Sequence, residues 1–146
     1  MILNKCYGGF RPSVFAYNEH AKRNGIELFW YHPVGKYDHG YAVYKLTNEP
    51  GFFDRPITKY LGRRIKANDI DRDCVYHLEE ASREDADLID IVEQYGERAS
   101  SSVSNLVVVE IPDCLAGRYI VDEYDGFETL HENVPIWSRG ELMTIK

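Results

Sequence analysis

The stretch Tyr119–Glu132, YIVDEYDGFETLHE, decides how the last third of this chain folds. Asp125-Gly126 stands there between two segments in which apolar and polar residues alternate. Asp-Gly is the strongest short-range signal for a two-residue hairpin turn, because both residues adopt a positive φ at little cost. The sequence therefore predicts an antiparallel β-hairpin that turns at these two residues.

The same hairpin carries several carboxylates and one histidine. Alternation along a strand places Asp122 and Tyr124 on one face and Glu123 on the other, so only some of the carboxylates can converge. A Mg²⁺ or Mn²⁺ site would need His131 to join Asp122 and Glu128 from the opposite strand. This spacing is not diagnostic of a metal. A charged surface hairpin is the favoured interpretation, and we expect no cofactor.

Length and charge limit the classes of function. A chain of 146 residues fits one compact domain, residues 1–146. The net charge of -7 argues against nonspecific binding to nucleic acid or to an anionic membrane, since both need a basic face. The first nine residues are too short an apolar run for a signal peptide or a membrane span. The three cysteines lack CxxC spacing and are expected to be reduced thiols in a cytoplasm.

Strands that pair in hairpins, with two helices among them, predict an α+β fold on a mostly antiparallel sheet. The expected elements are a strand at residues 1–6, a helix between Ser13 and Gly25, a hairpin of residues 26–34 and 40–47, a helix at 83–95 closed by Gly96, and a strand at 106–111. Residues 48–82 are interpreted as a variable insertion, in which 57–65 fit a strand or a short helix. The core is expected to bring Leu88, Ile91 and Val92 against Leu106, Val108 and Ile120.

The loop Tyr7-Gly8-Gly9 lies between the first strand and the helix that opens at Ser13. Free backbone N–H groups and the helix dipole can attract an anion in such a loop. The loop lacks both the GxGxxG spacing and the lysine of a phosphate-binding loop. A strand-to-helix turn is therefore the favoured interpretation, and anion binding is the alternative.

One segment reverses the acidic character of the chain. It contains Arg55, Lys59, Arg63, Arg64 and Lys66, with Tyr60 interleaved. Guanidinium groups bind phosphate or pyrophosphate through two parallel hydrogen bonds, and a tyrosine ring can stack on a base. Many basic clusters are only solvated surface, which is the alternative here.

Three blocks of sequence stand out: NKCYGGF at Asn4–Phe10, DADLIDIVEQYG at Asp85–Gly96, and VEIPD at Val109–Asp113 followed by EYDG at Glu123–Gly126 with Glu128, His131 and Glu132. Together they resemble a family of small proteins of tailed bacteriophages and prophages. The resemblance leaves the middle of the chain uncovered. It implies a viral origin and a host bacterial cytoplasm, and it implies no reaction.

Three classes of function remain open. The chain is a protein that sequesters a small anionic, nucleotide-like host signalling molecule, an inhibitor that contacts a host protein, or a small metal-dependent hydrolase that acts on nucleotides. No serine or cysteine has a base beside it in sequence, so nucleophilic catalysis has no positive support. Phage proteins of this size that are not structural often act against host defence, which favours sequestration. We then expect a homo-oligomer with Arg63 or Arg64 in a concave basic pocket.

Overall fold

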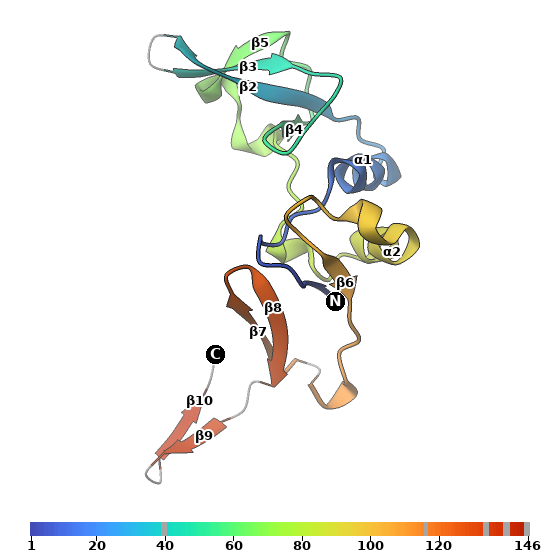
Figure 1. Ribbon diagram of the computed structural model, residues 1–146, viewed down its shortest axis with the longest axis vertical. Helices are drawn as coiled ribbons and strands as arrows, with labels where there is room; N and C mark the ends of the chain where they lie inside the picture. Colours follow the sequence, from blue (N-terminus) through green and yellow to red (C-terminus); the bar gives the residue numbers. More distant parts are fainter. Residues whose placement is uncertain (39–40, 116, 133–134, 139–140, 145–146) are drawn as a thin grey trace.

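The computed structural model describes residues 1–38, 41–115, 117–132, 135–138 and 141–144. The fold is α+β, with two α-helices and antiparallel sheets, as the sequence predicts. Figure 1 shows a four-stranded sheet at one end of the molecule, the two helices beside it, and two hairpins toward the other end. None of the helices in the described ranges is long and apolar enough to span a membrane.

The four-stranded sheet has the order β4-β2-β3-β5 and all its pairs are antiparallel. Its strands are β2 (Phe29–Asp38), β3 (Tyr41–Leu46), β4 (Arg55–Ile57) and β5 (Arg64–Lys66). The predicted pairing of β2 with β3 is confirmed, and the turn residues 39–40 lie outside the described residues. Residues 48–82 supply both edge strands, so this segment completes the sheet.

No single strand or helix spans residues 57–65. The segment leaves β4 at Ile57, turns at Gly62 with φ of +97°, and enters β5 at Arg64 on the other edge of the sheet. Tyr31, buried beneath it, fixes this path. Its hydroxyl accepts a hydrogen bond from the N–H of Leu61 at 2.9 Å and donates one to the carbonyl oxygen of Gly62 at 2.7 Å.

Helix α1 (Val14–Arg23) lies between Ser13 and Gly25, as its sequence predicts, and helix α2 (Ala86–Tyr95) ends at Gly96 as predicted. Helix α2 begins at Ala86 and not at the predicted Arg83, because the Asp85 side chain caps it there. Helix α1 is capped by Ser13, whose hydroxyl accepts from the N–H of Ala16 at 3.1 Å. Gly96, at the end of α2, has φ of +57°. A side-chain acceptor at the N-cap satisfies a backbone N–H that has no partner inside the helix.

Buried apolar residues form two clusters. The first lies on the four-stranded sheet and includes Tyr31, Tyr44, Ile57, Ile65 and Cys74. The second joins the helices to a two-stranded ribbon of β1 (Ile2–Asn4) and β6 (Leu106–Val108), and it includes Ile2, Leu88, Ile91, Val92 and Leu106. The expected contact of α2 with Leu106 and Val108 is confirmed. Ile120 is not part of this cluster, because its strand pairs only within its own hairpin.

The predicted hairpin is present as β7 (Tyr119–Tyr124) and β8 (Phe127–Glu132). Its turn residues Asp125 and Gly126 have φ of +49° and +89°, the positive values that the Asp-Gly signal requires. Strand β6 ends at Val108, before the predicted Ile111, because its partner β1 begins at Ile2. The tail has little periodicity in sequence, yet β9 (Pro135–Ser138) and β10 (Glu141–Thr144) pair there as a second hairpin.

Candidate functional site

The predicted basic cluster divides between the two edges of the four-stranded sheet. Arg55 is on β4 and Arg64 is on β5, with β2 and β3 between them. The guanidinium carbon of Arg55 lies 5.6 Å from the centre of the Tyr44 ring. Lys59 is exposed in the connection between β4 and β5. The sheet order therefore keeps Arg55 apart from Arg63 and Arg64.

Arg63 and Arg64 line a concave surface, which we call the basic hollow. Its residues are Lys45, Leu46, Asn48, Arg63 and Arg64. The carbonyl oxygen of Arg63 accepts a hydrogen bond from the N–H of Leu46 at 2.8 Å, which attaches the incoming loop to β3. All five lining residues belong to one copy of the chain.

Lys45 and Arg64 lie directly opposite each other on the paired strands β3 and β5. Both are exposed, as is Arg63 beside them. No carboxylate in the described part of the chain forms an ion pair with any of these three cations. Like charges directly opposite on antiparallel strands destabilise a sheet, so an anion bound between them would relieve repulsion.

A second concave surface, the aromatic hollow, adjoins the basic one. It shares Leu46 and Asn48 with the basic hollow and adds Asn18, Glu27, Phe29, Trp30 and Tyr60. The Tyr60 ring is 58 % exposed and forms a T-shaped pair with Phe29, with ring centres 5.7 Å apart. Of the predicted binding residues, Tyr60, Arg63 and Arg64 thus line two neighbouring hollows.

The Gly8-Gly9 loop is occupied by close packing. A Cβ on Gly8 would lie 1.9 Å from the carbonyl oxygen of Val103, and a Cβ on Gly126 would lie 2.5 Å from the nitrogen of Gly9. Tyr7 packs on Phe127 of the same hairpin, with ring centres 5.3 Å apart. These contacts support the strand-to-helix turn, in which the glycines let three backbone segments approach one another.

The three residues of the alternative metal site do not converge. Nε2 of His131 lies 3.8 Å from Oδ2 of Asp122, so these two side chains share a face of the hairpin. Glu128 is opposite Glu123 in the register, and alternation places it on the other face. Its side chain is buried there at 4 % exposure, where it pairs with Arg83 and accepts from the N–H of Asn4 at 2.9 Å.

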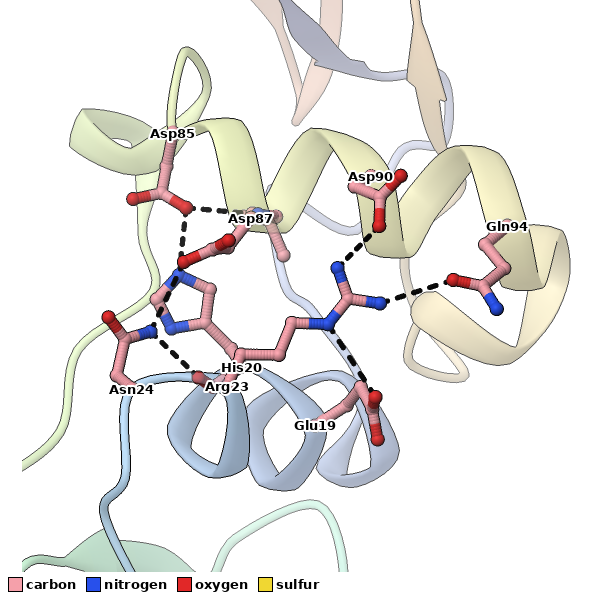
Figure 2. Close-up of polar contacts among 9 residues, drawn as sticks. Glu19, His20, Arg23, Asn24, Asp85, Asp87, Asp90 and Gln94 are labelled. Atoms are coloured by element: carbon pink, nitrogen blue, oxygen red, sulfur yellow. Dashed lines mark hydrogen bonds and ion pairs between the residues drawn. The ribbon is translucent and has the colours of Figure 1, made fainter.

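A hydrogen-bonded cluster joins the two helices, and no spacing of residue types in the sequence indicates it. His20 on α1 is buried, and its Nε2 lies 2.8 Å from Oδ1 of Asp85 (Figure 2). Its Nδ1 lies 2.5 Å from the hydroxyl of Tyr76. Burial acts to raise the pKa of Asp85, but the N–H of Leu88 and the His20 ring outweigh it and hold that pKa below its usual value. Burial raises the pKa of Tyr76.

These contacts clamp the helices together. His20, Asp85 and Asp87 have ligand atoms within 4.8 Å of one another, the spacing of a small metal site. Both nitrogens of His20 are already hydrogen-bonded, and Oδ1 of Asp85 also caps α2. Figure 2 shows Arg23 extending the clamp along the helices, where its guanidinium lies 2.5 Å from Oδ2 of Asp90.

Comparison of the chain with protein-family models, with curated proteins and with solved structures found no match. The candidate site therefore rests on its own geometry. Lys45 is the residue that sequence reasoning missed, because it belongs to an alternating strand far from the basic segment. The register of β3 with β5 brings it to Arg64, and no local spacing of residue types indicates the pairing of two strands this far apart in sequence.

Proposed function

We propose that this chain is a phage-encoded accessory protein of the host bacterial cytoplasm that sequesters a small anionic, nucleotide-like signalling molecule. The observation that carries the proposal is the juxtaposition of Lys45 and Arg64 across β3 and β5, with Arg63 beside them. Three cations without an acidic partner in the described ranges are suited to a ligand with two or more negative charges.

The chemistry of the basic hollow supports phosphate as the recognised group. Each guanidinium presents a planar fork of N–H donors that matches two phosphate oxygens, and Lys45 adds a point charge. Hydrogen bonds to charged groups contribute about 1.5–3 kcal/mol each. Two guanidinium groups that each bind two phosphate oxygens therefore supply most of the roughly 8 kcal/mol of binding free energy of a micromolar ligand. The acidic remainder of the chain disfavours long nucleic acids and leaves a small anion as the ligand.

The lining residues support binding without turnover. Within the described ranges, the basic hollow is lined by cations, one amide and one leucine, with no carboxylate, histidine, serine or cysteine. General acid-base catalysis and nucleophilic catalysis both need such a group within reach of the reacting atom. We expect the chain to form a homo-oligomer, because a second copy packed against the β5 edge would cover a ligand that one copy leaves accessible.

Isothermal titration calorimetry with inorganic pyrophosphate tests the proposal. The Arg63→Ala/Arg64→Ala double variant is expected to bind pyrophosphate at least about tenfold more weakly than the native chain, since two charged donors are lost. Lys59→Ala is the matched control, because it removes an exposed cation that does not line the basic hollow. An equal loss in both variants, or no binding by the native chain, would contradict the proposal.

A second candidate function, inhibition of a host protein by surface contact, is favoured by Phe52 and Phe53. Phe53 is 74 % exposed, and the guanidinium of Arg11 lies 4.1 Å from the centre of the Phe52 ring. Exposed aromatic rings beside arginine are typical of interface hot spots. If this candidate is correct, Phe53→Ala loses a host protein that the native chain captures, and Arg63→Ala/Arg64→Ala retains it. The opposite pattern would assign the capture to the basic hollow.

A further inference from the structure

The aromatic hollow and the basic hollow form one continuous surface. They meet at Leu46, the last residue of β3, and at Asn48 just beyond it. A molecule whose phosphates lie among Lys45, Arg63 and Arg64 therefore extends past Asn48 toward Tyr60. The two hollows differ in chemistry, and this difference specifies the rest of the ligand.

Tyr60 offers a stacking surface. Its ring is exposed and packs against the ring of Phe29 in a T-shaped arrangement. The backbone next to it is held in place, since the N–H of Leu61 donates to the buried hydroxyl of Tyr31. A ring that is fixed before binding loses little conformational entropy when a planar base stacks on it.

The polar groups of the aromatic hollow suit the edge of a base. The indole N–H of the buried Trp30 donates to Oδ1 of Asn18 at 2.8 Å, which fixes the amide and leaves its NH₂ group to donate elsewhere. The exposed carboxylate of Glu27 accepts hydrogen bonds only. A heterocyclic base carries both acceptors and donors along one edge, and a phosphate carries only acceptors.

Glu27 also sets the direction of binding. Its negative charge repels phosphate from the aromatic hollow, and the three cations attract phosphate to the basic one. We propose that the ligand is a nucleoside polyphosphate whose phosphates occupy the basic hollow and whose base stacks on Tyr60 in the aromatic hollow. This inference rests on the proposed function, because it takes the basic hollow as the phosphate site.

The experiment compares ADP and GDP with inorganic pyrophosphate on three forms of the full chain, by calorimetry. The native chain is expected to bind at least one of the two nucleotides about tenfold more tightly than pyrophosphate, since base stacking adds affinity. Tyr60→Leu is expected to lose this advantage, and Tyr60→Phe, which keeps the ring, to retain it. Pyrophosphate affinity is expected to be the same in all three forms.

The possible failures are distinguishable. If the native chain does not bind pyrophosphate, the proposed function and this inference both fail. If pyrophosphate binds but neither nucleotide binds more tightly, or Tyr60→Leu keeps the advantage, the aromatic hollow does not hold a base and the anion site stands alone. Equal loss of pyrophosphate and nucleotide binding in Tyr60→Leu would assign Tyr60 to the phosphate site and also overturn the inference.

Discussion

Gly126, at the tip of the β7–β8 hairpin, lies against Gly9, so close that a Cβ on Gly126 would stand 2.5 Å from the Gly9 nitrogen. The side-chain amide of Asn4 donates to the carbonyl oxygen of Gly126 at 2.7 Å, and Nζ of Lys5 donates to the carbonyl oxygen of Glu128 at 2.7 Å. Two blocks of sequence more than a hundred residues apart therefore form one contact.

Gly126→Ala is expected to destabilise the chain by about 2–4 kcal/mol, because it adds a steric overlap to the strain of a positive φ. Gly126 has φ of +89°, and the overlapping atoms belong to the backbone, which cannot rotate away. Urea unfolding measures the loss. Gly25→Ala is the matched control, since Gly25 has φ of +70° and no atom within 4 Å of the added Cβ. Its expected loss is about 1 kcal/mol. Equal losses would show that the contact with Gly9 contributes nothing.

Arg83→Met is expected to destabilise the chain by about 3–5 kcal/mol, because it leaves the Glu128 carboxylate buried without its cation. Glu128 is buried, and its remaining donor is the N–H of Asn4. Arg23→Met is the control, since its partners Asp90 and Glu19 have side chains that are 60 % and 21 % exposed and so remain in contact with water. An exposed ion pair contributes about 0–1 kcal/mol. Urea unfolding at pH 7 compares the variants. Equal losses of unfolding free energy would show that pairing with the buried Glu128 is worth no more than an exposed ion pair.

The stability of the helix clamp is expected to depend on Asp85 in acid. Because folding lowers the pKa of Asp85, its contribution is fully present above the unfolded pKa of about 3.9 and is lost as the pH falls through the lower folded pKa. Asp85→Asn keeps a side-chain oxygen to cap α2 but cannot titrate. The free energies of unfolding of the native chain and of this variant are therefore expected to converge between about pH 5 and pH 2.

Asp87→Asn serves as the control for this measurement. Asp87 lies in the same turn of α2, and its Oδ2 accepts a hydrogen bond from the side-chain amide of Asn24 at 3.3 Å. This variant is expected to lose stability in acid in parallel with the native chain, because it keeps the titrating group at Asp85. If the free energy of unfolding of Asp85→Asn also runs parallel to that of the native chain from pH 7 to pH 2, the charge of Asp85 contributes nothing to the stability of the His20 clamp.

Local signals in the sequence predicted most of the elements of this fold. Ser13 and Gly96 mark helix ends because their effects act within one turn of chain, whereas the cap at Asp85 was not predicted. The Asp125-Gly126 turn is equally local. Residues 48–82 could not be predicted in this way, because β4 and β5 are three residues each and exist only through pairing with β2 and β3.

The candidate site was predictable only in part for the same reason. Arg63 and Arg64 are adjacent in sequence, so their charges were visible as a cluster. The exclusion of Arg55 and the inclusion of Lys45 depend on sheet order and register, which are long-range properties. His20 contacts Asp85 across 65 positions of sequence, and no spacing of residue types indicates such a contact.

Arg64→Glu is expected to change stability and binding in opposite directions. A carboxylate opposite Lys45 replaces a like-charge pair with an attractive one, which contributes about 0.2–1 kcal/mol to stability. The same change removes one guanidinium from the basic hollow and repels phosphate, so pyrophosphate affinity is expected to fall by more than about tenfold. Urea unfolding and calorimetry on one preparation measure both effects.

Lys59→Glu is the control. It introduces the same charge on an exposed residue away from the basic hollow and is expected to leave pyrophosphate affinity within about twofold. A rise in stability with unchanged pyrophosphate affinity would contradict the anion site. Reversing the charge of a residue that binds an anion must weaken the binding of that anion.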